Sequence, residues 1–254
     1  MDSFGLTASG LTLEIQHRYK AMNRFCEGYR VELPLSSETE AAAGPAAIRP
    51  DAVISVTDEE LEAERRRAEA IGRSFSMGYY EITAIFRKIA EFLPRTGRFL
   101  MHGSALAMDG EGYMFTAPSG TGKSTHASFW RKAFGPRVVM VNDDKPFIRI
   151  DAESGKAFVS GNPWNGKHRL GCNAEFPLKA LCVLTRGEEN FVRPLSREDA
   201  FPVLLRQVYR PSDPGMLAAT LDLLDAFERG VKLYTMSCNL DPDAARTAYE
   251  GMRD

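Results

Sequence analysis

The chain has 254 residues, and its 32 Lys and Arg against 34 Asp and Glu give a formal net charge of −2. This length predicts one large domain, or one domain with a smaller appendage, and 44% hydrophobic with 26% charged residues indicates a folded chain. The charge balance favours neither a nucleic-acid nor a membrane partner. The four cysteines form no CxxC pair, and the sequence has no signal-peptide pattern and no apolar run near the ~20 residues of a membrane span. We therefore expect a cytoplasmic protein with free thiols and no structural zinc.

The first third predicts a mixed α/β segment with strands at 11–15, 29–33 and 51–56. Apolar and polar residues alternate at 11–15, which is the period of a strand. Residues 36–50 are rich in Ala, Ser, Glu and Pro without periodicity, so we expect a surface loop there.

Two helices are expected before residue 95. Thr57 and Glu60 form a capping box that predicts a helix to about Gly72, with a largely exposed charged face over 62–67. Apolar residues then recur at helical spacing over 77–93, and Pro94 stops this second helix.

A hairpin is expected next, from strands at 99–108 and 113–116 around the turn Asp109-Gly110-Glu111-Gly112. The second strand leads directly into a glycine-rich segment that ends in Gly-Lys-Ser-Thr.

That segment has the pattern of a phosphate-binding loop, although Ala117 stands where the strict GxxxxGK[ST] template has glycine. Gly120 and Gly122 permit positive φ, so backbone N–H groups can surround an anion, and a helix beginning after the loop would direct its positive end at the phosphate. Lys123 is expected on the β and γ phosphates and the Ser124 hydroxyl on Mg²⁺. The predicted phosphate-binding residues are Ser119, Gly120, Thr121, Gly122, Lys123, Ser124 and Thr125.

An apolar strand at 138–141 is followed by Asn142 and the acid pair Asp143-Asp144. A buried strand that ends in carboxylates can hold a metal beside a phosphate loop. One acid can hold Mg²⁺ while the other accepts a proton from an attacking hydroxyl. The alternative is an ordinary turn at a strand end.

Three families of phosphate-loop proteins are disfavoured. The chain has no LSGGQ-like signature of ABC-type ATPases, no NKxD base reader of GTPases and no Arg-rich lid of nucleoside-monophosphate kinases.

Taken together, His102-Gly103, the loop and Asp143-Asp144 resemble the superfamily of HPr kinase/phosphorylase and phosphoenolpyruvate carboxykinase over about residues 99–185. The carboxykinase is roughly twice as long, so the HPr-kinase branch fits better. The resemblance implies an α/β (α+β) fold with a P-loop core, ATP and Mg²⁺ as cofactors, and catalytic roles for Lys123, Asp143, Asp144 and His102. Mg²⁺ would be held by Ser124 and the acid pair, His102 would orient or tune that pair, and the division of duties between the two acids is open.

The segment 160–169 departs from the HPr-kinase pattern, which is acidic and glycine-rich there. Its aromatic, amide and basic side chains could contact substrate or stabilise charge, and the alternative is an ordinary basic turn. The candidates are Trp164, Asn165, Lys167, His168 and Arg169, with Glu175 as a further acidic metal ligand.

The C-terminal third predicts helices that begin at Ser196, at 212–215 and at Asp241-Pro242, with a strand at 231–236. Their apolar stripes, including Leu217, Leu221, Leu224 and Phe227, are expected in the core. The resemblance implies that such helices can take part in protein-substrate binding and in forming an oligomer.

The predicted organisation is an α/β appendage at 1–95, which is the expected region of acceptor recognition, and a kinase domain at 96–254. The predicted function is transfer of the γ-phosphoryl group of ATP to a hydroxyl, either of a serine in a peptide or protein or of a small molecule. The alternatives are a nucleotide-gated binding module without turnover, or the reverse phosphorylase or dephosphorylating reaction.

Overall fold

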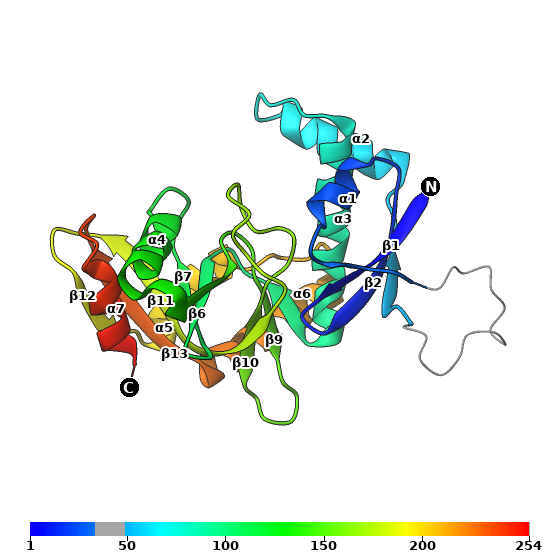
Figure 1. Ribbon diagram of the computed structural model, residues 1–254. Coiled ribbons are helices and arrows are strands. Elements are labelled where there is room, and N and C mark those ends of the chain that lie inside the picture. The colour runs from blue at the N-terminus through cyan, green and yellow to red at the C-terminus, as the bar shows by residue number, and fades with distance from the viewer. Residues whose placement is uncertain (34–48, 254) are drawn as a thin grey trace. The chain divides into compact units, whose positions relative to one another are not determined.

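The computed structural model describes residues 1–33 and 49–253, so the expected loop at 36–50 lies almost entirely outside the described residues. The described chain is a mixed α/β fold with seven α-helices and two β-sheets. It divides into two compact units, Met1–Ala90 and Glu91–Asp254 (Figure 1). None of the helices in the described ranges is long and apolar enough to cross a membrane.

The first unit contains a four-stranded sheet in the order β3-β1-β2-β4. The hairpin of β1 and β2 turns at Ser9 and Gly10, which both have positive φ. Side-chain burial alternates strictly along β2, which confirms the strand expected from the period-2 pattern. The strands are β1 Asp2–Ala8, β2 Leu11–His17, β3 Arg30–Val31 and β4 Ala52–Ile54.

The helices of this unit are α1 Ala21–Phe25, α2 Asp58–Glu69 and α3 Met77–Phe92. The capping box is confirmed, because the Thr57 hydroxyl accepts from the Glu60 N–H at 3.3 Å and the Glu60 carboxylate accepts from the Thr57 N–H at 2.8 Å. The expectation that 62–67 is an exposed face is wrong at Glu64. This carboxylate is buried and accepts from the guanidinium groups of Arg67 and Arg87, which compensates its charge.

The second unit contains a nine-stranded sheet with the path β5-β9-β10-β11-β7-β6-β8, while β13 pairs with β11 and β12. Strand β11 pairs antiparallel with β10 near its beginning and parallel with β7 and β13 further on. The strands are β5 Arg98–Leu100, β6 Ser104–Met108, β7 Glu111–Thr116, β8 Val138–Asn142, β9 Phe147–Ile150, β10 Ala157–Ser160, β11 Glu175–Arg186, β12 Phe191–Pro194 and β13 Lys232–Cys238.

Helices cover both faces of this sheet. Along β11, Leu181 and Val183 belong to one core while Cys182 and Leu184 belong to the other, because successive strand side chains point to opposite faces. Helices α5 Arg197–Gln207 and α6 Pro214–Gly230 pack on the first core. Helices α4 Lys123–Phe134 and α7 Ala244–Met252 pack on the second and lie side by side in Figure 1.

The hairpin of β6 and β7 is confirmed, with Asp109 and Gly110 in the positive-φ turn between them. The expected single strand at 99–108 is wrong, because it is two strands, β5 and β6. Between them the N–H of His102 donates to the Gln207 carbonyl and that of Gly103 to the Asp144 carbonyl. Because these two N–H groups donate outside the sheet, the pairing between strands is interrupted at this point.

The C-terminal helices form where expected, with two corrections. Ser196 caps α5 as predicted and Asp213 caps α6, whereas α7 begins at Ala244, later than the predicted start at Asp241-Pro242. Leu221, which was expected in the core, is 37% exposed, and the neighbouring Thr220 is buried instead. The Thr220 hydroxyl donates to the Met216 carbonyl at 2.8 Å, which satisfies its polar group inside the core.

Candidate functional site

The segment 117–122 joins the end of β7 to the start of α4. Gly120 and Gly122 have φ of 80° and 120°, and an added Cβ would meet no atom within 4 Å at either position. Glycine is therefore required there by backbone conformation and not by lack of space. Lys123 is the first residue of α4, so the unsatisfied N–H groups of the first helical turn open beside this loop.

The side chains of this segment divide between the core and the surface. Ala117 is fully buried, so a small non-glycine residue fits where the strict template has glycine. Thr121 folds onto the loop, where its hydroxyl donates to the Pro118 carbonyl at 2.9 Å. Polar side chains at the surface of the loop and of the first turn of α4 come from Ser119, Ser124 and Thr125.

Lys123 folds back over the loop. Its Nζ donates to the carbonyl oxygens of Ala117 and Pro118 at 2.9 and 3.3 Å. Burial lowers the pKa of Lys123, while the negative charges of Asp144 and Asp143 act in the opposite direction. The ammonium group therefore contacts the loop carbonyls and interacts electrostatically with the acid pair.

The acid pair follows β8 in a turn that Asn142 organises. The buried Asn142 Oδ1 accepts from the N–H groups of Asp144 and Lys145 at 2.9 and 2.8 Å. Asp143 Oδ1 accepts from the Ser104 hydroxyl at 2.6 Å, and Asp144 Oδ2 accepts from Lys145 Nζ at 2.7 Å. Each acid thus has its own partner, which gives the two carboxylates different surroundings.

His102 lies beside Asp144, with Nε2 at 3.8 Å from Asp144 Oδ1. Its Nδ1 lies 2.9 Å from Gln207 Oε1, and because an amide oxygen only accepts, Nδ1 carries the proton in the neutral ring. Burial lowers the pKa of His102 although the Gln207 hydrogen bond opposes this. The neutral ring therefore turns an unprotonated Nε2 toward Asp144.

Glycine is required at position 103, next to His102, for a steric reason. A Cβ on Gly103 would lie 2.4 Å from Met114 Cε and 2.9 Å from the Phe115 carbonyl oxygen. Only glycine lets the chain approach β7 this closely while its N–H donates to the Asp144 carbonyl at 2.9 Å. The His102-Gly103 segment therefore packs against β7, which leads into the phosphate loop, and is hydrogen-bonded to the acid pair.

The first half of the segment 160–169 supports the acid-pair turn. Asn162 is buried, and its Nδ2 donates to the Lys145 carbonyl at 2.6 Å while its Oδ1 accepts from the Trp164 N–H at 2.8 Å. Lys145 Nζ lies 4.4 Å from the centroid of the Trp164 ring, a distance typical of cation–π contact. Asn165 is buried next to Trp164.

The second half of that segment is exposed. Gly166 has φ of 75° and approaches the Asp143 carbonyl so closely that an added Cβ would lie 3.2 Å from it. Lys167 and His168 line a cavity together with Ser124 and Asp143. Arg169 is exposed with positive φ and is not among the residues that line this cavity.

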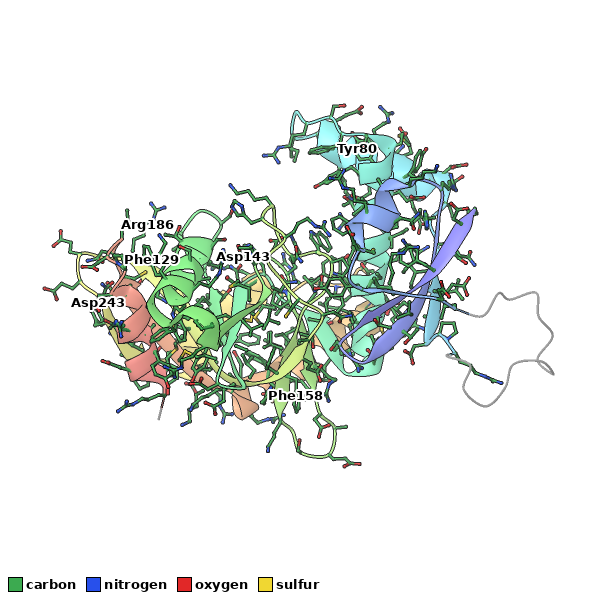
Figure 2. All side chains as sticks on the ribbon, viewed as in Figure 1. Tyr80, Phe129, Asp143, Phe158, Arg186 and Asp243 are labelled. Carbon is green, nitrogen blue, oxygen red and sulfur yellow. The ribbon has the colours of Figure 1, made fainter. Side chains whose placement is uncertain are left out.

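Two cavities flank α4. The α4–β13 cavity has about 640 Å³ and is lined by Gly120, Thr121, Gly122, Thr125, His126, Phe129, Arg186, Gly187, Cys238, Asn239 and Leu240. The α4–β8 cavity has about 480 Å³ and is lined by Ser124, Thr125, Ala127, Ser128, Arg131, Met140, Asp143, Lys167, His168 and Leu170. In Figure 2, Phe129 and Arg186 are labelled on one side of α4 and Asp143 on the other.

Four site residues were not expected from the sequence: Ser104, Gln207, Arg131 and Arg186. Gln207 contacts His102 across 105 positions of the sequence, so no local pattern indicates it. Arg186 ends β11 and donates from Nη2 to the Gly120 carbonyl at 2.6 Å. Of the four, only Arg131 could have been found from the sequence. It follows Ser124 by seven residues in the expected helix, and residues at that spacing lie on the same helix face.

The residues that could hold a divalent cation are few. Across 1–33 and 49–253 no group of three or more His, Cys, Asp or Glu side chains could hold a metal. Glu175, a sequence candidate, is instead held by Arg149 and Ser160. The Ser124 hydroxyl has no hydrogen-bond partner among the described residues and lines one cavity with Asp143, and Asp144 is the neighbouring carboxylate. Such a sparse set fits Mg²⁺, which keeps several waters and takes one or two carboxylates plus substrate phosphates.

Comparisons with known proteins show a distant structural likeness to solved structures. No family model matches the chain, and no curated protein matches it. Among solved structures, the HPr(Ser) kinase/phosphatase from Coxiella burnetii is similar to 61% of this chain and 93% of its own, with 14% identity and a TM-score of 0.34.

Proposed function

We propose that the chain is an ATP- and Mg²⁺-dependent phosphotransferase of the HPr-kinase type, which transfers the γ-phosphoryl group to a hydroxyl. The observation that carries this proposal is that Ser124, at the start of α4, and Asp143, at the end of β8, line one cavity beside Lys123. A phosphate site and a carboxylate next to it are the two parts that phosphoryl transfer needs.

The phosphates would bind at the loop between β7 and α4. Positive φ at Gly120 and Gly122 lets backbone N–H groups converge there, and the helix dipole adds positive potential. The ammonium group of Lys123 donates hydrogen bonds to the carbonyl oxygens of Ala117 and Pro118. A bound phosphate would compete for its ammonium group through a stronger, charge-assisted contact.

The nucleoside would occupy the α4–β13 cavity. Phe129 supplies an aromatic surface on one wall and Leu240 an apolar one on another. Arg186 lies between this cavity and the loop, because it lines the cavity and donates to the Gly120 carbonyl. An extended nucleotide can therefore have its base in this cavity and its phosphates at the start of α4.

The reaction follows from the position of Asp143. The acceptor hydroxyl oxygen attacks the γ-phosphorus, the bond from that phosphorus to the β–γ bridging oxygen breaks, and ADP leaves with the bonding electron pair. Asp143 Oδ2 takes the hydroxyl proton, while Ser104 fixes the carboxylate through Oδ1. Mg²⁺ would be held by Ser124 and by Asp144, the other member of the acid pair, and would neutralise charge on the phosphate oxygens.

Asp144 and His102 would act around this centre and not on the hydroxyl. The charge of Asp144 is balanced by Lys145 and faces Lys123, so it can fix the position of the phosphate-binding lysine. His102 is a positioning residue, since Gln207 fixes its ring against Asp144.

Replacement of the acid tests the proposal. Asp143→Asn removes the proton acceptor but keeps the size of the side chain, so transfer from ATP should fall by about 10²-fold or more while nucleotide affinity stays within a few-fold of the parent. An Asp143→Asn protein that retains full transfer would contradict the assigned role. A parent protein that binds ATP without any turnover would indicate the nucleotide-gated module instead.

A further inference from the structure

The lining of the α4–β8 cavity carries an excess of positive charge. Arg131 and Lys167 are cationic, and His168 adds imidazole nitrogens. None of the three side chains makes a hydrogen bond or ion pair with another part of the described chain, and all three are exposed. Asp143 is the one acidic residue in the lining. Unpaired cations gathered around a cavity attract an anion.

The charges are separated along α4. Ser124 and Arg131 are seven residues apart, which places them on one face of the helix about 10 Å apart along its axis. Ser124 adjoins the phosphate loop, whereas Arg131 lies near the other end of the helix. The cavity therefore has a reacting end with Ser124 and a cationic end with Arg131.

We propose that this cavity binds the acceptor through an anionic group, so that the acceptor is a small hydroxyl compound that also carries a phosphate or carboxylate. This inference rests on the proposed phosphotransferase function and specifies its substrate class. The anion contacts Arg131, with Lys167 in the same lining adding positive potential, and the neutral hydroxyl end lies at Asp143, whose own charge repels an anion from that end.

Size and wall chemistry agree with a small molecule. About 480 Å³ is within the range of small-molecule sites, roughly 300 to 1,000 Å³. Met140 and Leu170 give part of the wall an apolar surface for a carbon skeleton. Arginine and lysine bind phosphate and carboxylate alike, so the two kinds of anion must be separated by experiment.

The experiment measures anion binding to the full chain saturated with a non-hydrolysable ATP analogue and Mg²⁺, so that the phosphate loop is already filled. Calorimetric titrations use glycerol 3-phosphate, glycerate and inorganic phosphate, with neutral glycerol as the uncharged counterpart. Two double variants are compared with the parent. Arg131→Ala with Lys167→Ala removes the cavity cations, and Lys132→Ala with Lys156→Ala removes two exposed cations outside it.

We expect at least one anion to bind and glycerol not to bind. The cavity double variant should bind that anion at least tenfold more weakly, while the control double variant and the affinity for the analogue stay within twofold. The preferred probe, glycerol 3-phosphate or glycerate, then identifies the anionic group.

Equal anion binding in the two double variants, or no anion binding to the nucleotide-loaded parent, would overturn the inference while the proposed function stands. Phosphorylation of an uncharged serine peptide at equal rates by the parent and the cavity variant would overturn it in favour of a protein acceptor. Failure of the analogue itself to bind would remove the proposed function, and this inference with it.

Discussion

The Ser104 hydroxyl donates a hydrogen bond of 2.6 Å to Asp143 Oδ1, from the first residue of β6 to the acid that follows β8. This contact occupies Oδ1 of Asp143, a residue that lines the α4–β8 cavity, while Oδ2 has no hydrogen-bond partner among the described residues. The orientation of the acid thus depends on a buried hydroxyl two residues after His102.

Ser104→Ala should therefore lower kcat by about tenfold to a hundredfold, since a hydrogen bond to a charged group contributes about 1.5–3 kcal/mol. The KM for ATP should change little, because Ser104 touches no nucleotide-binding residue of the loop. Ser160→Ala is the matched control, because it removes another buried serine that donates to a carboxylate, Glu175, at 2.7 Å. Equal losses of activity in both variants would show a general loss of stability and not a positioning role.

Lys123→Ala should weaken ATP binding by about tenfold to a hundredfold, the loss of one charge-assisted phosphate contact of about 1.5–3 kcal/mol. Isothermal titration calorimetry measures this directly. Lys132→Ala is the control on the same helix, since Lys132 is exposed and lines neither cavity. Unchanged affinity in Lys123→Ala would remove the assignment of the phosphate loop.

Leu240→Asp tests the position of the nucleoside. Leu240 is 81% exposed, so the substitution should not disturb folding, yet it places a charge on an apolar wall of the α4–β13 cavity. ATP affinity should fall about fivefold or more, the equivalent of roughly 1 kcal/mol, whereas pyrophosphate affinity should not change. Ile71→Asp in the first unit, at another exposed apolar side chain, should affect neither ligand. An equal loss for ATP and pyrophosphate would place the nucleoside elsewhere.

Glu228 predicts a pH dependence of stability. Burial, assisted by the charge of Asp225, raises the pKa of Glu228 from 4.5 to about 6, and Oε1 has no hydrogen-bond partner among the described residues. The folded state therefore binds more protons than the unfolded state between about pH 4.5 and 6, so the free energy of unfolding falls as pH rises through this window and stays lower above it.

Glu228→Gln should accordingly raise Tm at pH 7.5 and leave it nearly unchanged at pH 4. Thermal denaturation across this range measures the difference, with Glu250→Gln, an exposed position on α7, as the control. A Tm increase that is the same at both pH values would contradict the ionisation account.

Much of the fold was predictable because its signals are local. The capping box at Thr57 and Glu60, the period-2 pattern of β2 and the Asp109-Gly110 turn depend on neighbours within a few residues, and all three are confirmed. The interruption between β5 and β6 was not predictable. It depends on hydrogen bonds from His102 and Gly103 to Gln207 and Asp144, which are distant in sequence.

The site shows the same division. The order of His102, the loop and the acid pair indicated which residues come together, and the functions assigned to them stay predictions. The sequence could not separate Asp143 from Asp144. The two carboxylates differ in their hydrogen-bond partners, which are Ser104 for Asp143 and Lys145 for Asp144. Lys145 in turn lies over the ring of Trp164, which belongs to a separate loop. Thr220 replaces Leu221 in the core for a similar reason, because helix rotation is set by packing.

The most direct test of the central claim is a thermal-shift titration of the full chain with ATP, GTP, ADP and pyrophosphate, each with and without Mg²⁺. A ligand that binds only the folded state raises its stability, by about 2.7 kcal/mol at a hundredfold excess over Kd. We expect Mg²⁺-dependent stabilisation by ATP. No shift with any of these ligands, with or without the metal, would contradict nucleotide binding and with it the proposed phosphotransferase.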